Sequence, residues 1–220
     1  MKFFLDSAMT DEIAHALDKW DINGVTTNPR HVQASGKPFM QVIKEIGKMM
    51  EGTDKTVSVE VSPYTMEWQK MVEDGKRLAA LHPNFVVKIH CVEDAFKATR
   101  ELAKANIRVN MTLVFSASQA LQAMRCGAYY VSPFIGWKES NGEETRSFIQ
   151  DLVDIRDNYD FKTQILVAAV RNGRQIADAA AMGADIVTAG HAVYKESFEH
   201  PYTQDGLKKF QGFWDKSKYE

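Results

Sequence analysis

The sequence predicts an α/β protein built as a single (βα)8 TIM barrel with an additional C-terminal helix. Two patterns lead to this prediction: short apolar or β-branched runs alternate with longer stretches of helical periodicity, and about eight such units follow one another with short connections. The length of 220 residues also fits, because α/β barrels of this size commonly form one unit. We therefore expect one domain over residues 1–220.

The expected strands are short and mostly apolar. They cover residues 2–6, 24–27, 57–61, 85–89, 107–113, 128–132, 163–168 and 185–189. The expected helices carry apolar residues at helical spacing, as in Phe39, Val42, Ile43, Ile46 and Met50. They cover residues 11–20, 39–50, 66–81, 93–105, 118–125, 143–158, 175–182 and 202–219.

A doubly wound parallel sheet is the competing topology. That fold usually needs fewer strands at this length, and its first turn is Gly-rich. The sequence contains neither GxGxxG after a predicted strand nor GxxxxGK[ST], so the barrel is preferred. The final helix over 202–219 contains Phe210, Phe213 and Trp214, and we expect it to pack on the barrel or on a neighbouring subunit.

Composition argues against several classes of function. Lys+Arg number 27 and Asp+Glu 29, without a basic cluster, so nucleic-acid binding has no electrostatic support. No apolar stretch reaches the length of a membrane-spanning helix. The six histidines show no HxH or HxxxH spacing, which disfavours a zinc-dependent aldolase. Two cysteines without a CxxC, and an N-terminus without the apolar segment of a signal peptide, predict a reducing cytoplasm.

One lysine lies inside an apolar run that predicts a buried strand. Lys88 follows Phe85-Val86-Val87, where a charged side chain is rarely buried without a role. Burial disfavours the ammonium form, so it lowers the pKa of a lysine and yields a neutral, nucleophilic amine. Lys88 is therefore a candidate for a Schiff base with a ketone. A strand-edge lysine that extends to solvent is the alternative interpretation.

Polar residues recur at or near the carboxyl ends of the predicted strands. These ends meet at one face of a (βα)8 barrel, where the functional sites of such barrels lie. We therefore expect one pocket to collect these residues. In chain order they are Asp6, Thr26, Thr27, Asn28, Glu60, Lys88, Asn110, Thr112, Ser132 and Arg171.

Each of these residues also has a purely structural interpretation. Asp6 could cap a helix, Asn28 could belong to a turn, and Glu60 could lie at a solvated strand edge. As a set, they supply what aldol cleavage through a Schiff base requires: an amine, carboxylates that move protons, and amides or hydroxyls that orient a polyol. The set therefore strengthens the interpretation of Lys88 as a nucleophile.

Several motifs together resemble the transaldolase family of class I aldolases. They are FLDS at 4–7, GVTTNP at 24–29, VVKI at 86–89, NMTLVFS at 110–116, VSPFIG at 131–136 and RN at 171–172. They follow one another in barrel order, and GVTTNP combined with NxTLxFS is the most specific signature. The resemblance implies a (βα)8 barrel that transfers dihydroxyacetone between aldoses.

The resemblance also implies four catalytic residues. Lys88 would form the imine with the ketone of the donor, and Asp6 would take the proton of the C4 hydroxyl as the C3–C4 bond breaks. Glu60 and Thr112 would bind the water that carries protons during imine formation. The implied route needs no metal and no organic cofactor, because the protonated imine serves as the electron sink.

A second group of residues would bind the sugar: Thr26, Asn28, Asn110, Ser132 and Phe134. In the family, the two asparagines would hold the retained dihydroxyacetone, and Ser132 and Phe134 would line the pocket. The compact fructose-6-phosphate aldolases typically carry Gln at the position of Glu60 and Tyr at the position of Phe134. The residues present here favour transfer over simple cleavage.

The chain departs from the family where ordinary transaldolases bind the substrate phosphate. Those enzymes use an Arg, a Ser and an Arg, whereas this chain has Trp137, Ala169 and Arg171. Loss of such donors without replacement would weaken phosphate binding by about tenfold or more. The sequence therefore implies a different anion or a rebuilt anion site.

Candidate replacements in that site are Arg30, His31, Trp137 and Lys138, beside Arg171. Trp137 offers one N–H donor and a broad apolar face, which suits a sulfonate better than a more heavily hydrated phosphate dianion. The stretches TTNPRH, SGKPF, SPFxGWKE, AAxRNG and VYKESF also resemble the branch of the family that processes a sulfonated ketose. In the alternative interpretation, Arg30 is a solvated loop charge and Trp137 a subunit contact.

The resemblance thus implies transfer of dihydroxyacetone from 6-deoxy-6-sulfofructose to glyceraldehyde 3-phosphate or erythrose 4-phosphate, with release of sulfolactaldehyde. An ordinary transaldolase or a fructose-6-phosphate aldolase is the second hypothesis. A non-catalytic sugar-binding barrel, in which Lys88 only pairs with Glu60 or Asp6, is the third. Compact members of the family form pentameric rings paired into decamers, so a homo-oligomer is expected.

Overall fold

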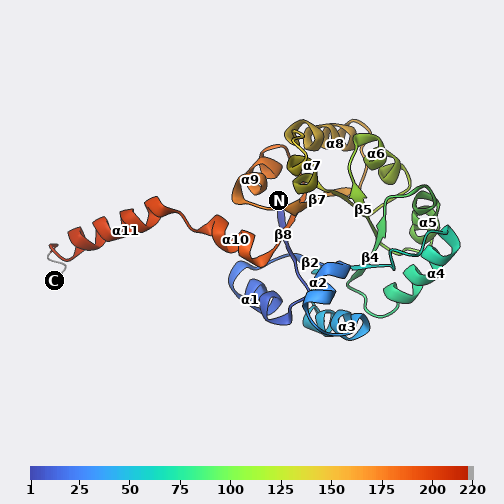
Figure 1. Ribbon diagram of the computed structural model, residues 1–220, viewed down its shortest axis with the longest axis horizontal. Helices are drawn as coiled ribbons and strands as arrows, with labels where there is room; N and C mark the ends of the chain where they lie inside the picture. Colours follow the sequence, from blue (N-terminus) through green and yellow to red (C-terminus); the bar gives the residue numbers. More distant parts are fainter. Residues whose placement is uncertain (218–220) are drawn as a thin grey trace.

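The computed structural model describes residues 1–217 and is built around a closed barrel of parallel strands (Figure 1). The strands are β1 (Lys2–Asp6), β2 (Gly24–Thr26), β3 (Thr56–Glu60), β4 (Phe85–His90), β5 (Val109–Val114), β6 (Tyr130–Pro133), β7 (Gln164–Val170) and β8 (Ile186–Ala189). Each pairs with the next along the chain, and β8 returns to pair with β1. The predicted (βα)8 barrel is confirmed.

One main helix follows each strand and covers the outside of the barrel (Figure 1). These helices are α1 (Thr10–Trp20), α3 (Phe39–Met49), α4 (Trp68–Ala79), α5 (Glu93–Lys104), α6 (Ala117–Arg125), α8 (Arg146–Asn158), α9 (Gly173–Ala181) and α10 (His191–Phe198). The last of these was not among the predicted helices, because its eight residues are too few to reveal a helical period.

Two further short helices lie in the loops at the carboxyl ends of the strands. Helix α2 (Pro29–Ala34) follows β2, and α7 (Ile135–Ser140) follows β6. Neither helix was predicted from the sequence, although the start of α2 carries a local signal. Asn28 accepts a hydrogen bond from the His31 backbone N–H as N-cap, and Pro29 occupies the first helical position.

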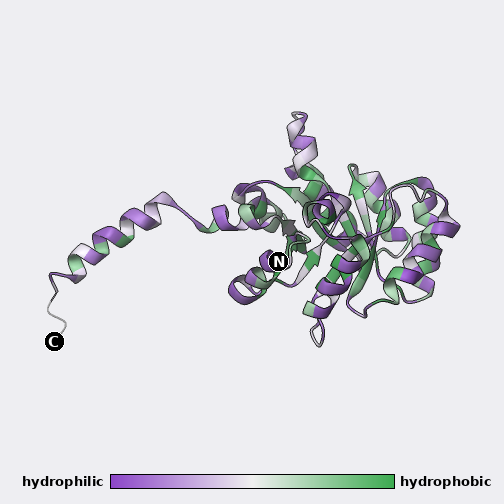
Figure 2. Ribbon diagram, turned by 60° about the horizontal axis from the view of Figure 1, so that its bottom comes forward, coloured by the Kyte–Doolittle hydropathy of each residue, from purple (hydrophilic) through white to green (hydrophobic). Residues whose placement is uncertain are grey.

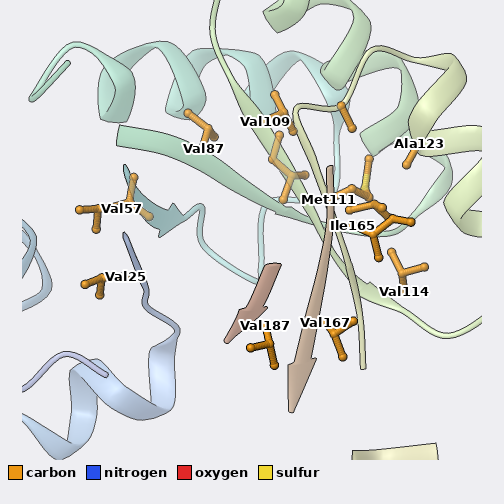
Figure 3. Close-up of a cluster of buried hydrophobic side chains, with 14 of the residues drawn as sticks. Val25, Val57, Val87, Val109, Met111, Val114, Ala123, Ile165, Val167 and Val187 are labelled. Atoms are coloured by element: carbon orange, nitrogen blue, oxygen red, sulfur yellow. The ribbon is translucent and has the colours of Figure 1, made fainter. Parts of the chain in front are cut away.

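The two faces of the barrel wall have different compositions. Side chains alternate between the faces along each strand. Odd-numbered residues such as Val25, Val57 and Val87 belong to the apolar core between the strands and the surrounding helices (Figure 3). Up to the register shifts on β5 and β7, after which Val114 and Val170 belong to the outer core, even-numbered residues point into the barrel. The lower inner layer is apolar: Phe4, Val86, Tyr130, Leu166 and Ile186. The polar even-numbered residues therefore collect above this layer, at the carboxyl ends of the strands.

Helix α11 (Pro201–Trp214) extends away from the barrel as an arm (Figures 1 and 2). It is shorter than the predicted helix over 202–219, whose last residues lie outside the described part of the chain. Phe210 and Phe213 are 71% and 69% exposed, so α11 does not pack on its own barrel as one form of the prediction had it. Within residues 1–217, no helix is both long and apolar enough to span a membrane.

Candidate active site

Lys88 lies at the floor of the site, on β4. Its side chain is only 5% exposed, and its ammonium lies 3.1 Å from Glu60 Oε2. The ammonium also donates to the backbone carbonyl of Thr27 at 3.0 Å. The pairing of β3 with β4 sets Glu60 opposite Lys88, so strand register brings the two charges together. The buried ammonium of Lys88 is stable here because a carboxylate and a carbonyl replace the water molecules that would hydrate it in solution.

Thr112 adds an available hydroxyl beside this pair. It is fully buried on β5 and lies opposite His90 of β4. Among the described residues, neither the Thr112 hydroxyl nor either ring nitrogen of His90 has a hydrogen-bond partner. Buried polar groups are normally paired, and of these two residues only Thr112 lines the same cavity as Lys88. The unpaired Thr112 hydroxyl suits a substrate group or an ordered water.

Asp6 lies at the end of β1 within a chain of hydrogen bonds. Thr26 donates to Asp6 Oδ1 at 2.7 Å, and Thr26 is in turn bonded to Thr188 at 2.7 Å. His31 Nε2 lies 3.0 Å from Asp6 Oδ2. Burial alone would raise the pKa of Asp6, but the hydrogen bond and charge of His31, the charge of Lys88 and the bond from Thr26 together lower it below its ordinary value.

Asn110 lies deeper than the sequence analysis predicted. Its amide donates to Ser58 Oγ at 3.0 Å, and its carbonyl oxygen accepts from Ser132 Oγ at 2.7 Å. The side chain is fully buried and is not among the groups that line the cavity. Asn28 does line the cavity, although its carbonyl oxygen is occupied as the cap of α2.

A cavity of about 330 Å³ opens above these groups. It collects most of the predicted site residues: Asp6, Thr26, Asn28, Arg30, His31, Glu60, Lys88, Thr112, Ser132, Phe134 and Trp137. A second cavity of about 420 Å³ adjoins it between α2, α3 and α4 and shares Asn28 and Glu60. That larger cavity lacks Lys88 and Asp6, so the smaller one is the candidate active site.

The rim of the cavity is aromatic on one side and cationic on the other. Phe134, Phe115 and Trp137 form an aromatic cluster with ring centroids 5.6 to 5.9 Å apart. Arg30 lines the opposite side, from α2. Trp137 is 52% exposed, so its indole has a free face at the mouth of the barrel.

Two predicted anion ligands are bonded to residues that do not line the cavity. The ammonium of Lys138 bonds the Glu143 carboxylate and the Phe115 carbonyl, and the guanidinium of Arg171 bonds the hydroxyl of Ser140. Neither residue lines the cavity, which differs from the sequence prediction. Both stabilise the position of α7 instead, because Ser140 ends that helix and Lys138 lies within it.

Backbone irregularities on two strands shape the same rim. Leu113 on β5 and Ala169 on β7 both have φ of 57°, and the strand register shifts beside each of them. A Cβ on Gly136 would come within 2.1 Å of the Ala169 carbonyl oxygen, so only glycine lets α7 approach β7 this closely. Bulges near strand ends commonly redirect side chains next to active sites.

Thr188 and Ser58 also belong to the polar layer, although neither was among the residues predicted from the sequence. Both lie at even-numbered strand positions, on the same face as Lys88 and Asp6. The alternation of side chains along strands was the signal that could have found them. In residues 1–217, no group of three or more His, Cys, Asp or Glu side chains is arranged to hold a metal ion.

The fold and the cavity define the class of protein: a (βα)8 barrel with a lysine-centred site at the carboxyl ends of its strands. More particularly, the chain belongs to the transaldolase/fructose-6-phosphate aldolase family, whose model matches residues 3–219. The resemblance inferred from the sequence motifs is thereby confirmed, and the chain is an enzyme of this family.

Individual proteins resemble this chain over most of its length. The 6-deoxy-6-sulfo-D-fructose transaldolase of Priestia aryabhattai is 52% identical over 221 residues, covering 100% of this chain and 98% of its own. A probable transaldolase of Desulfatibacillum aliphaticivorans is 44% identical, covering 99% and 100%. Thiamine phosphate pyrophosphorylase from Pyrococcus furiosus shares the fold alone, with a TM-score of 0.64, 13% identity, and coverage of 89% and 93%.

Proposed function

We propose that this chain transfers dihydroxyacetone from 6-deoxy-6-sulfofructose to glyceraldehyde 3-phosphate or erythrose 4-phosphate and releases sulfolactaldehyde. One observation carries the proposal: a buried lysine amine and two carboxylates converge on one cavity, as Lys88, Glu60 and Asp6. Amine and carboxylates are the groups that a Schiff-base aldol reaction requires. The relatives from Priestia support the choice of a sulfonated donor.

The first step is formation of the imine. Glu60, 3.1 Å from the ammonium, accepts a proton from Lys88, and the neutral amine attacks C2 of the ketose. The carbinolamine then loses water, for which the oxygen at C2 must be protonated. The unpaired hydroxyl of Thr112 and the carboxylate of Glu60 are placed to hold the water that carries this proton.

The second step is cleavage of the C3–C4 bond. Asp6 takes the proton of the C4 hydroxyl, the electron pair of the breaking bond moves into the protonated imine, and the aldehyde leaves. The resulting enamine attacks the carbonyl carbon of the acceptor, and Asp6 returns the proton to the new C4 oxygen. Hydrolysis of the second imine frees the product and Lys88. The low pKa of Asp6 keeps this group ionised and ready to accept the proton.

The retained dihydroxyacetone would be oriented by short polar side chains around Lys88. Asn28, Thr26 and Ser132 line the cavity and offer amide and hydroxyl groups. Asn110 would act one layer below, by fixing Ser132 through its 2.7 Å hydrogen bond. Phe134 closes the wall between this layer and the rim.

The charged end of the donor would meet the rim. Arg30 supplies a fixed positive charge, and the Trp137 indole supplies one N–H and an apolar face for a weakly hydrated sulfonate. Lys138 and Arg171 would contribute by holding α7 in place, since their cationic groups are bonded elsewhere. The acceptor phosphate would use the same site in the second half of the reaction.

Two experiments test the proposed function. Borohydride reduction in the presence of the ketose donor, followed by peptide mass spectrometry, should place an adduct on Lys88; its absence would favour the non-catalytic barrel. Side-by-side kinetics with sulfofructose and fructose 6-phosphate should favour the sulfonate. Release of the aldehyde product should depend on the acceptor, whereas acceptor-independent release would identify a fructose-6-phosphate aldolase.

We further propose that the chain assembles with copies of itself through α11. The exposed Phe210 and Phe213 lie on a helix that extends from its own barrel, and burial on a second copy would remove that apolar surface from water. A pentameric ring, or a decamer, is the assembly expected for the family. Sedimentation of the wild type and of the double variant F210S/F213S tests this, with a smaller species expected for the variant.

A further inference from the structure

We propose that His31 is a positioning residue for Asp6: its imidazole holds the carboxylate in the orientation that accepts the C4 hydroxyl proton. This differs from the anion-binding role that its place beside Arg30 suggested. The inference rests on the proposed function, because Asp6 needs to be positioned as a base only if an aldol bond is broken. It concerns a residue that acts through Asp6 and does not itself react.

The hydrogen bonds around Asp6 define its orientation. His31 Nε2 lies 3.0 Å from Oδ2, and Thr26 Oγ1 lies 2.7 Å from Oδ1. A carboxylate only accepts hydrogen bonds, so Nε2 of His31 must carry a hydrogen. Each carboxylate oxygen is thus bonded once from the protein and keeps lone-pair capacity for the substrate hydroxyl. Rotation of the Asp6 side chain would break both bonds.

The fold fixes the imidazole as firmly as the carboxylate. His31 is the third residue of α2, and its backbone N–H is bonded to the Asn28 side chain at 3.1 Å. From this position its ring reaches back to the end of β1. On the other side, Thr26 is bonded to Thr188, so β8, β2 and α2 all hold one carboxylate of β1. The His31 and Asp6 side chains are only 20% and 23% exposed, which limits competition from bulk water.

The charges near Asp6 decide the sign of the pH effect. Lys88 of β4, Glu60 of β3 and Arg30 of α2 line the same cavity. Burial raises the pKa of Asp6, and the bond and charge of His31, the charge of Lys88 and the bond of Thr26 outweigh burial. Removal of His31 therefore raises the pKa of Asp6. Since Asp6 acts as a base, the acidic limb of the kcat profile should then move to higher pH.

The two steps of the reaction separate a positioning role from an anion-binding role. Imine formation uses Lys88, Glu60 and Thr112, whereas Asp6 acts only when the C3–C4 bond breaks or forms. Loss of His31 should therefore slow cleavage and leave imine formation intact. An anion ligand would behave differently, because its loss would raise KM for charged donors and have no effect on a neutral ketose.

The experiment compares His31→Leu, His31→Gln and Arg30→Gln in the full-length protein. Leucine removes the donor at similar volume, whereas the glutamine amide can restore an N–H toward Asp6. Each protein is measured with sulfofructose and with neutral fructose as donor. Borohydride trapping with dihydroxyacetone alone reports imine formation without any aldol step.

For His31→Leu we expect kcat to fall by about 10- to 100-fold with both donors, the acidic limb to move to higher pH, and trapping at Lys88 to stay at the wild-type level. His31→Gln should recover most of kcat and return the acidic limb toward its wild-type position, because the glutamine amide again donates an N–H to Asp6. Arg30→Gln should raise KM for sulfofructose and displace the acidic limb less than His31→Leu does, because Arg30 is not among the groups that set the pKa of Asp6.

Three results would overturn the inference. One is a rise in KM for sulfofructose alone with unchanged kcat in His31→Leu. Another is a His31→Gln variant that folds like the wild type but loses kcat as fully as expected for the leucine variant, which tests the inference even if the leucine variant is unstable. The third is loss of imine trapping in both His31 variants. If the wild type itself forms no adduct, the proposed function fails. If the wild type forms the adduct and the His31 variants have the same kcat and pH profile as the wild type, only the inference about His31 fails.

Discussion

The floor and the rim of the cavity are held in place in different ways. On the floor, paired strands fix the groups: Glu60 faces Lys88 in register, and Asp6 faces Thr26. At the rim, Arg30 and Trp137 are carried by α2 and α7, two helices of six residues each inserted after strands. Substitutions of Arg30 in α2 and of Trp137 in α7 can therefore change the rim without moving the groups on the floor. We expect bond chemistry and anion selectivity to be physically separable in this molecule.

The largest expected effect comes from the floor. Lys88→Arg keeps the positive charge beside Glu60 but cannot form an imine, so we expect activity to fall on the order of 10³-fold or more. The borohydride-dependent mass adduct should disappear at the same time. Thermal unfolding serves as the control, because a variant that folds like the wild type yet retains transfer would contradict the role of Lys88.

A second change on the floor should separate the two chemical steps. Asp6→Asn preserves the shape of the side chain but removes the base, and we expect transfer to fall by roughly 10²- to 10⁴-fold. Trapping of dihydroxyacetone on Lys88 should persist, because imine formation does not use Asp6. Loss of both transfer and trapping would mean that Asp6 also takes part in imine formation. It would contradict the assignment of Asp6 to the C3–C4 bond alone.

Changes at the rim should have smaller effects, confined to charged substrates. Arg30→Gln removes the fixed charge, and we expect KM for sulfofructose to rise about tenfold with little change in kcat. Arg125→Gln on α6 is the matched control, since Arg125 is exposed and bonded only to Gln122 among the contacts described. Equal effects of the two substitutions would show that Arg30 is only a solvated surface charge.

The smallest effect on catalysis is expected from substitution of Ser58, which lies below the cavity and bonds Asn110. Ser58→Ala leaves the buried Asn110 amide without its acceptor, which should cost about 1–3 kcal/mol of folding free energy. Denaturant unfolding measures this cost, with Ser118→Ala as an exposed control expected within about 0.5 kcal/mol of the wild type. A catalytic loss larger than tenfold at unchanged stability would mean that Asn110 contacts the substrate directly.

The sequence predicted the floor better than the rim. Lys88, Asp6 and Glu60 were placed correctly in one pocket because a residue at the end of a barrel strand has a nearly determined location. Lys138 and Arg171 were expected at the anion site, and the structure directs both of them elsewhere. A long cationic side chain in a loop has many possible partners, and its neighbours in sequence do not reveal which one it chooses.

The sequence by itself determined the barrel, the family and the identity of the buried lysine, since strand alternation and motif order are local properties of the chain. Only the tertiary structure decided that His31 bonds Asp6, that Asn110 lies beneath the cavity, and that α11 leaves its own barrel. These features depend on contacts between residues far apart in the chain, and on two short helices with too few residues to show a period. For that reason Lys88 could be identified from the sequence, whereas the partners of the charged groups around it could not.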